Sequence, residues 1–319
     1  MFLLRLDVLA ILLIILGLIS LFIGVIHIPV AQLLKLSKDE IDVLILARMP
    51  RTVSIIITGM SLSICGLVMQ QLTQNKFVSP TTAGTMDCAK FGILISIIFF
   101  AGSSFLTQVF IASFFALLGS LIFLQILNKI RVKDVIFVPL IGLMFGGIIS
   151  SVSTFFAYQL NLIQNMQSWL QGNFSNLMQG SYEALYISMP LLVLVYFYAN
   201  KITIVGMGKD MALNLGISYK FIMNLGLIIV AVISSVVILT VGVIPFLGLI
   251  IPNIVSIYKG DNLKDNIATI TLLGAVFLLL CDIFSRLIIA PFEVPISLTV
   301  GIVGSFIFAF ILLKRRAYD

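Results

Sequence analysis

Ten apolar stretches follow one another along this chain and leave little sequence between them. Most are close to the ~20 residues that a helix needs to cross the hydrocarbon core of a bilayer. A helix that is apolar all round must be surrounded by protein or by lipid. The pattern therefore predicts an all-α polytopic membrane protein with about ten transmembrane helices. The stretches lie at 8–26, 52–74, 82–101, 105–127, 135–160, 183–200, 221–242, 246–258, 266–285 and 296–313.

The composition excludes a soluble domain of appreciable size. Hydrophobic residues make up 61% of the 319 positions and charged residues only 10%, whereas soluble proteins carry about 25% charged residues. Ten spans use about 200 positions, so no nucleotide-binding or catalytic domain fits beside them. We expect residues 1–319 to form a single transmembrane domain that takes its energy from a partner or from an ion gradient.

The distribution of Lys and Arg predicts the orientation of the chain. An even number of crossings places both termini on the same side. If that side is the cytoplasm, the inner loops hold thirteen Lys and Arg residues and the outer loops five, which is the excess that cytoplasmic loops carry. The N and C termini are therefore predicted to be cytoplasmic, and the net charge of +6 needs no nucleic-acid partner.

Signatures of catalysis and of metal binding are weak. Residues 206–210 resemble a phosphate loop, but Asp210 stands where Ser or Thr would hold magnesium. The chain has one histidine, His27, and its three cysteines lie in apolar stretches, so neither a His-rich metal site nor a disulfide framework is expected. We expect no enzyme activity, no bound cofactor and no metal site in this chain.

The segment Arg48-Met-Pro50-Arg51 lies between the first two predicted spans. Proline is expected to fix a turn there, and the two cations are expected to stay hydrated at the membrane interface. On chemistry alone the arginines are either interfacial anchors or a cationic pad for an acidic partner or an anionic solute.

The second predicted span is unusually rich in small and polar residues. Gly59 and Gly66 permit close approach of another helix, and Gln70 indicates a wet face or the cytoplasmic end of the span. These residues serve either helix packing or a translocation path.

Two pairs of opposite charges fall at helical spacing inside apolar stretches. Asp282 and Arg286 lie at i, i+4, and Asp87 and Lys90 lie at i, i+3. A lone charge at the bilayer centre costs roughly 2.5–3.5 kcal/mol on insertion scales. We therefore expect each pair to be an ion pair or to face a hydrated passage.

The eighth apolar stretch is short and is bracketed by Pro245 and Pro252. Helix-breaking residues at membrane depth require protein or water to satisfy the freed backbone groups. A broken or tilted segment is expected here, either in the packing of the bundle or beside the path.

A short amphipathic helix is expected in the predicted inner loop before the seventh span. Met211 and Leu215 lie at i, i+4 and share one side, and Gly216 is a natural C-cap. Such a helix either lies on the bilayer or inserts into a groove on a soluble partner.

In their order and spacing, these segments resemble the FecCD family, the membrane permeases of ABC importers for iron-siderophores, haem and cobalamin. Each motif alone is weak evidence for the family, but seven motifs in the right order and spacing are highly specific to it. The motifs are R-x-P-R at Arg48–Arg51, G-x(6)-G-x(3)-Q at Gly59, Gly66 and Gln70, NKFVSP at Asn75–Pro80, A-x-x-L-G at Ala212–Gly216, G-x-I-x-F-x-G-L-x-x-P at Gly242–Pro252, D-x-x-x-R at Asp282–Arg286 and E-x-P at Glu293–Pro295.

The resemblance implies a type II ABC importer permease fold in a bacterial cell membrane. It implies a second permease subunit, two cytoplasmic ATPases that bind the ATP and magnesium, and an external substrate-binding (lipo)protein. The solute would be a ferric siderophore. The residues implied to dock the binding protein are Arg48, Arg51 and Arg286, and those implied to form the ATPase coupling helix are Asp210, Met211, Ala212, Leu213, Leu215 and Gly216.

Other functions stay open at this point. The solute could be haem or cobalamin, although the variant stretch Thr81–Asp87 favours a branch associated with catecholate siderophores. A proton- or sodium-driven transporter would use Asp87 and Lys90 as its relay. A membrane-embedded enzyme is disfavoured, because the sequence lacks catalytic motifs. The sequence identifies neither the particular siderophore nor whether the permease pair is a homodimer.

Overall fold

Helices make up almost all of the described chain. The computed structural model describes residues 4–24, 38–100, 102–130 and 136–316, and His27 lies outside them. Each of the ten apolar stretches forms a helix, which confirms the all-helical prediction. These helices are α1 (Leu6–Phe22), α3 (Met49–Thr73), α4 (Thr85–Phe99), α5 (Phe105–Lys129), α6 (Phe137–Gln159), α8 (Ser188–Gly206), α10 (Tyr219–Thr240), α11 (Leu247–Lys259), α12 (Leu263–Leu287) and α13 (Ile296–Arg316). The short segments are α2 (Lys38–Val43), η3 (Leu44–Arg48), α7 (Ile163–Leu170), η4 (Glu183–Ile187) and α9 (Lys209–Asn214).

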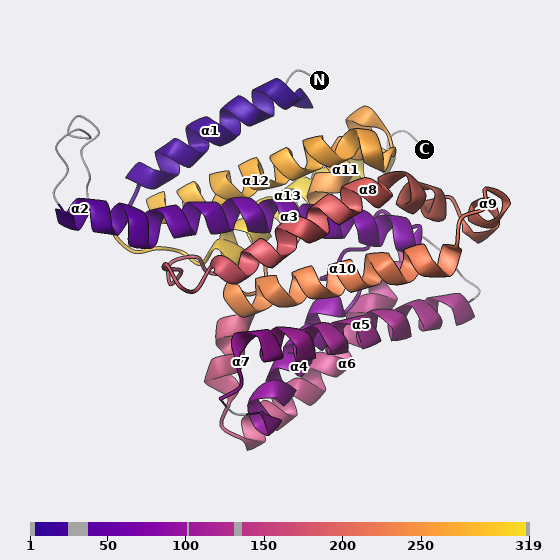
Figure 1. Cartoon of the computed structure of the whole chain (residues 1–319), viewed down its shortest axis with the longest axis horizontal. Coiled ribbons are helices and arrows are strands. Elements are labelled where there is room, and N and C mark those ends of the chain that lie inside the picture. Colours follow the sequence, from indigo (N-terminus) through magenta and orange to yellow (C-terminus); the bar gives the residue numbers. More distant parts are fainter. Residues whose placement is uncertain (1–3, 25–37, 101, 131–135, 317–319) are drawn as a thin grey trace.

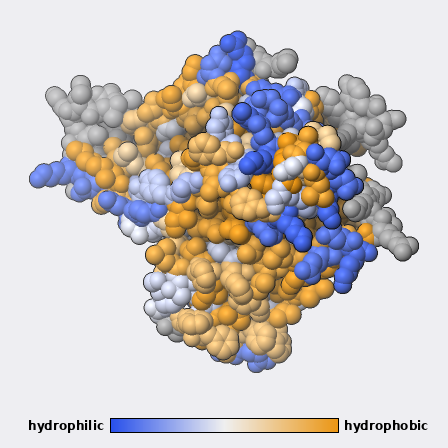
Figure 2. All heavy atoms as spheres, turned by 45° about the vertical axis from the view of Figure 1, so that its right-hand side comes forward, coloured by the Kyte–Doolittle hydropathy of each residue, from blue (hydrophilic) through white to orange (hydrophobic). Residues whose placement is uncertain are grey.

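The surface of the bundle is that of a membrane protein. Six helical segments of the described chain are long and apolar enough to cross a bilayer, and three shorter helices are also apolar. Large apolar side chains remain exposed, including Phe110 and Phe306, each 73% exposed. Figure 2 shows apolar residues covering much of one face, with hydrophilic residues gathered towards its ends. An apolar surface this extensive requires lipid as its solvent.

Helix α3 runs through the middle of the bundle. It packs against α8, α10, α11 and α12, and 83% of its apolar span is buried. In Figure 1, α1, α11 and α12 lie on one side of it and α4, α5, α6 and α10 on the other. Both described termini and α9 lie towards one end of the bundle, and α2 lies at the opposite end. We call these the α9 end and the α2 end.

The turn predicted around Pro50 is wrong, because the chain is helical there. The π-helical turn Leu44–Arg48 leads directly into α3, and Pro50 occupies the first turn of α3. Proline has no N–H, so the carbonyl four residues earlier, that of Leu46, loses its usual helical donor. The backbone N–H of Gln179 donates to that carbonyl at 3.0 Å. Pro50 thus frees the acceptor that attaches the loop before η4 to η3, directly before α3.

Glycines bring α3 into backbone contact with its neighbours. A Cβ at Gly59 would lie 2.6 Å from the carbonyl oxygen of Gly274 in α12, and a Cβ at Gly66 would overlap the carbonyl of Gly248 in α11. That carbonyl has no helical donor, because the residue four positions later is Pro252. The Cα–H of Gly66 therefore faces a carbonyl that a proline has freed. Both α3 glycines are packing positions.

The eighth apolar stretch, where a broken or tilted segment is expected, forms α11, which has thirteen residues. It follows Pro245 and then Phe246, whose φ of 62° is left-handed. Pro252 lies inside the helix and does not end it. The expected interruption of the helix therefore falls at Phe246, directly before α11 begins.

We expect the substitution Gly66→Ala to destabilise the protein by about 1–3 kcal/mol, the usual range for overpacking a tight contact. The added methyl has no space beside the Gly248 carbonyl, and a carbonyl cannot move away as a flexible side chain can. Equilibrium unfolding in mixed micelles measures the change.

The matched control is Gly147→Ala in α6, where a Cβ would have nothing within 4 Å. It should be neutral, or stabilising by up to ~1 kcal/mol through helix propensity. Equal effects of the two substitutions would contradict backbone packing at Gly66.

Candidate functional site

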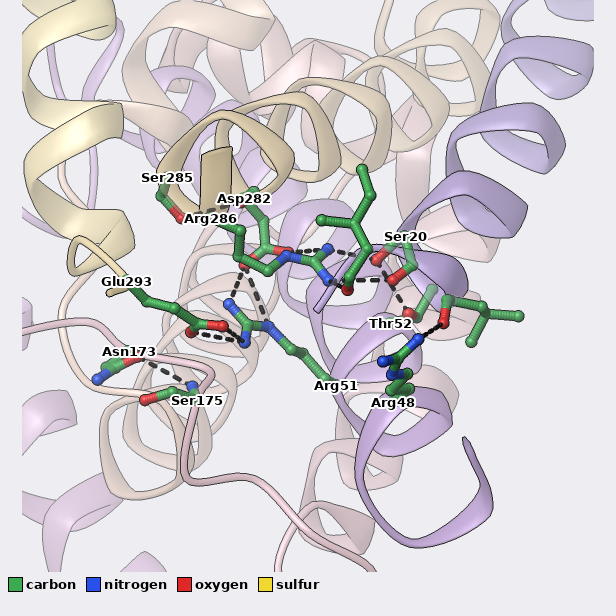
Figure 3. A network of polar contacts seen from close by, with 12 residues as sticks. Ser20, Arg48, Arg51, Thr52, Asn173, Ser175, Asp282, Ser285, Arg286 and Glu293 are labelled. Carbon is green, nitrogen blue, oxygen red and sulfur yellow. Dashed lines mark hydrogen bonds and ion pairs between the residues drawn. The ribbon is translucent and has the colours of Figure 1, made fainter. Parts of the chain in front are cut away.

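Five charged side chains from distant parts of the sequence meet at the α2 end. Arg48 belongs to η3 and Arg51 to the first turn of α3. Asp282 and Arg286 lie in the last turns of α12, and Glu293 lies in the loop before α13. We call these five residues the arginine cluster, which Figure 3 shows together with its hydrogen bonds.

The carboxylate of Asp282 is the centre of this cluster. It is fully buried, with Arg51 Nη2 2.8 Å from one oxygen and Arg286 Nη2 2.5 Å from the other. Arg51 also reaches Glu293, with 2.7 Å between Nη1 and Oε2. The expected i, i+4 pair is therefore present. The partners of Arg51 lie 231 and 242 residues away from it, so no local spacing could have indicated them.

Two arginines of the cluster cap the C-terminus of α1. The last carbonyls of a helix have no donor within the helix and carry the negative end of its dipole. Arg286 Nη1 donates to the carbonyls of Ser20 and Ile23 at 3.0 and 2.7 Å. Arg48 Nη1 donates to the two carbonyls between them, at 2.8 and 3.2 Å. Helix α1 is thus attached to the bundle through its own unpaired backbone groups.

A hydroxyl pair completes this attachment. Ser20 Oγ lies 3.1 Å from Thr52 Oγ1 of α3 and accepts Arg286 Nη2 at 2.6 Å. Figure 3 shows these hydroxyls between α1, α3 and α12. Three helices therefore meet in one hydrogen-bonded network.

The expectation that Arg48 and Arg51 stay hydrated is wrong. Arg48 is 7% exposed and Arg286 6% exposed, and the side chain of Arg51 is 13% exposed. A buried guanidinium needs acceptors for its N–H groups, which here are two carboxylates and the α1 carbonyls. The cluster carries one net positive charge, because three arginines face two carboxylates.

A cavity of about 310 Å³ adjoins the cluster. Arg286 and Glu293 line it together with Gly24 and Pro291. This cavity has room for a polar group of another molecule beside the buried charges.

Asp87 and Lys90 form a separate pair, with 2.6 Å between Oδ1 and Nζ. Asp87 lies in the first turn of α4, where the helix dipole favours an acidic group. Lys90 is buried, at 8% exposure. Each charge therefore has a partner of opposite sign, and their burial needs no proton relay to explain it.

Helix α9 ends in a Schellman motif at the α9 end. The N–H of Ile217 donates to the Ala212 carbonyl at 2.9 Å, and that of Gly216 donates to the Leu213 carbonyl at 3.0 Å. Gly216 has a φ of 70°, which a residue with a side chain adopts reluctantly. The C-cap expected from the sequence is present.

Three apolar side chains on α9 and at its C-terminal cap are exposed. Met211, Leu213 and Leu215 are 48–54% exposed, whereas Ala212 is fully buried against the bundle. Asp210, in the first turn, is exposed as well. Figure 1 shows α9 projecting beyond the long helices. The short helix therefore presents three apolar side chains away from the bundle on a fixed turn.

The loop after α3 is fastened to α11. Asn253 Nδ2 donates to the backbone carbonyl of Lys76 at 2.7 Å. Lys76 Nζ in turn donates to the carboxylate of Asp261 at 2.7 Å and to Ser256 Oγ at 2.8 Å. Gln70 Nε2 donates to the backbone of α11 at 3.4 Å. The sequence interpretation assigned no role to Asn253 or Asp261, because the contacts of both with Lys76 join residues about 180 positions apart.

Within the described ranges, no group of three or more His, Cys, Asp or Glu side chains is arranged to hold a metal ion.

Comparison with known proteins gives a match along almost the entire chain. The profile of the FecCD transport family matches residues 12–314. The petrobactin import system permease protein YclN of Bacillus subtilis (strain 168) is 56% identical over 98% of this chain and 99% of its own length. The ferric-anguibactin transport system permease protein FatD of Vibrio anguillarum (strain ATCC 68554 / 775) is 42% identical over 92% of this chain and 94% of its own length.

The fold also matches a solved structure. A protein described as a metal-chelate type ABC transporter in an inward-facing conformation superposes with a TM-score of 0.82. The two chains are 22% identical, and the match covers 97% of this chain and 98% of the other. At 22% identity, this structural similarity shows that the two chains share a fold.

We expect Arg286→Met to destabilise the protein by about 3–5 kcal/mol, the usual cost of removing one partner of a buried pair. The substitution keeps the bulk of the side chain but withdraws donors from Asp282 and from the α1 carbonyls. Hydrogen exchange should rise selectively at the C-terminal end of α1, and equilibrium unfolding in mixed micelles gives the free energy.

The control is Arg5→Met, which removes an exposed pair with Asp7 and should leave stability unchanged. If exchange in α1 stayed at the wild-type rate in Arg286→Met, the capping role would be refuted.

Proposed function

The chain belongs to the FecCD transport family, and from this we propose that it carries a ferric siderophore across the bacterial cell membrane as one permease subunit of an ABC importer. It is a multi-pass membrane permease, and ATP hydrolysis belongs to a partner subunit. The observation that carries the proposal is the family match over residues 12–314, which includes both α9 and the arginine cluster.

The α9 end is assigned to the cytoplasm in this proposal. The sequence supports the assignment, because the predicted cytoplasmic loops hold thirteen Lys and Arg residues and the predicted outer loops five. With α1, α4, α11 and α13 counted as crossings beside the six long segments, the chain spans the bilayer ten times and has the type II importer topology. Both termini are then cytoplasmic, and the arginine cluster faces the exterior.

The proposed role of α9 is to couple the permease to its ATPase. Its exposed Met211, Leu213 and Leu215 suit a groove on a soluble protein, and its Schellman cap holds the helix in one orientation. Two cytoplasmic ATPases and a second permease subunit complete the proposed importer.

The substrate class follows from the named relatives. Petrobactin import is attributed to the 56% identical protein and ferric-anguibactin transport to the 42% identical one, which favours a siderophore over haem or cobalamin. Within that class, the stretch Thr81–Asp87 favours the branch associated with catecholate siderophores. An ion-driven mechanism through Asp87 and Lys90 is disfavoured by family membership and by their mutual pairing.

The docking of an external binding protein is proposed at the arginine cluster. Arg48, Arg51 and Arg286 are buried, so they act as a group that projects one net positive charge and not as free surface side chains. An acidic residue of the binding protein would approach through the cavity lined by Arg286 and Glu293.

Reconstituted vesicles test the transport function. We expect uptake of ferric petrobactin only when the permease pair, the ATPase, the binding protein and ATP are all present. Leu215→Asp should reduce uptake to background, because a charge on the apolar face of α9 prevents docking of the ATPase.

The control is Lys209→Ala, at the start of α9 and outside its apolar face. It should leave uptake within about twofold of wild type, as an exposed polar change does. Uptake by this chain alone without ATP would refute the proposal, and normal ATPase assembly with Leu215→Asp would refute the coupling role of α9.

Docking at the cluster is tested by Glu293→Gln, which adds one net positive charge without removing an arginine. We expect the binding protein to bind about three- to tenfold more tightly at low salt, with a steeper loss of affinity as salt rises. Surface plasmon resonance on nanodisc-embedded permease gives both quantities.

Lys38→Gln, which removes an exposed cation from α2, is the comparison variant and should weaken binding only slightly. An affinity and a salt slope that do not change in Glu293→Gln would exclude docking through the charge of the cluster.

A further inference from the structure

The helical segment Ile41–Thr73 is longer than the hydrocarbon core of a bilayer is thick. It contains 33 residues, which at 1.5 Å per residue extend about 50 Å, whereas the core measures ~30 Å. Tilted by about 40°, at the upper end of the range seen for spanning helices, the segment still rises about 38 Å. Part of this segment therefore lies outside the hydrocarbon.

The contacts between α3 and α12 show that the N-terminal end is the part that projects. Arg51 is bonded to Asp282 in the last turns of α12. Two turns further along α3, Gly59 lies against Gly274, which is earlier in α12. The two helices are thus antiparallel, and the residues before Arg51 extend past the last turns of α12. Figure 1 shows α2 projecting beyond the ends of α10 and α12.

The projecting part carries apolar side chains that the chain leaves uncovered. Two of them, Ile41 and Ile45, are one turn apart and share one side of the helix. Lys38 and Asp42 are exposed beside them. An apolar patch with a polar rim is typical of a contact with another protein. We call the apolar residues, each 40–49% exposed, the outer ridge: Ile41, Ile45, Leu46 and Met49.

The loop before η4 enlarges this apolar surface. The N–H of Gln179 donates to the Leu46 carbonyl at 3.0 Å, which brings the neighbouring Met178 close to the ridge. Met178 is 58% exposed. Methionine is enriched where proteins bind one another, because its flexible side chain adapts to a partner surface.

The outer ridge is continuous with the arginine cluster. Ile45 and Leu46 belong to the same π-helical turn as Arg48. A Cβ at Gly24 would lie 3.1 Å from Arg48 Nη2, and Gly24 lines the cavity of about 310 Å³ beside the cluster. A protein that placed an acidic residue in this cavity would therefore meet the ridge as well.

We propose that the outer ridge seats in an apolar groove of the external binding protein. This rests on the proposed function, in which that protein docks at the arginine cluster. The two parts of the surface have different tasks. The net charge of the cluster speeds association, whereas burial of the ridge slows dissociation. The binding protein is thus attracted by charge and retained by apolar contact.

Binding kinetics of Ile45→Gln test this division. With the complete permease pair in nanodiscs and the binding protein that supports uptake in vesicles, we expect dissociation about tenfold faster than from wild type. Association should stay within about twofold, and the dependence on salt should not change, because no charge is altered. Glutamine is a good helix former and the site is exposed, so the fold is retained.

The matched control is Leu106→Gln, in the first turn of α5 at the α2 end. Leu106 is 66% exposed and lies outside the ridge, so dissociation should equal that of wild type. Unchanged dissociation in Ile45→Gln, or the same acceleration in both variants, would overturn the proposal.

A fluorescent label on Ile45→Cys tests what covers the ridge. The three native cysteines are buried, so a thiol-reactive bimane labels the new site selectively. In the permease pair alone, iodide should quench the label, and the binding protein should protect it. Quenching by nitroxide-bearing lipids would place the ridge in the bilayer, and a label that neither quencher reaches would place it against the second permease subunit. Either result would overturn the proposal.

Glu293→Gln separates this inference from the proposed function. If Glu293→Gln steepens the loss of affinity with salt while Ile45→Gln dissociates at the wild-type rate, only the role of the ridge fails. If neither variant changes binding, docking at the α2 end fails as a whole.

Discussion

The carboxylate of Asp282 connects helices that lipid would otherwise leave free to separate. Helices in a bilayer gain little hydrophobic stabilisation by packing on one another, so close contacts and polar links hold them together. A buried carboxylate is tolerated only when it is paired, and Arg51 and Arg286 pair with both of its oxygens. Those arginines also reach Glu293 and the carbonyls of α1. Three helices and a loop therefore depend on one acidic group.

Helix α3 joins this network to the opposite end of the protein. Its first turn carries Arg51, its middle lies against the backbones of α12 and α11 at Gly59 and Gly66, and its last turn places Gln71 beside the junction of α8 and α9. Backbone contacts leave no side chain whose rotamer could absorb a displacement. Helix α3 thus links the two ends of the protein through contacts that have little freedom to adjust.

The two ends of the protein differ in what they present outward. At the α2 end, the outer ridge adjoins arginines that are paired with carboxylates and backbone carbonyls of the same chain. At the α9 end, the apolar side chains of Met211, Leu213 and Leu215 are exposed.

The sequence by itself determined the ten helices, their membrane class, the pairs Asp282–Arg286 and Asp87–Lys90, and the cap at Gly216, because each of these depends on residues within one or two helical turns. The tertiary structure alone decided that Arg51 joins two carboxylates more than 200 residues away, that Arg48 and Arg286 cap α1, and that Gln179 takes the carbonyl freed by Pro50. The physical reason lies in the solvent. Apolar side chains face lipid and protein equally well in a bilayer, so hydrophobic patterning shows that a helix spans the membrane but not which helix it will contact.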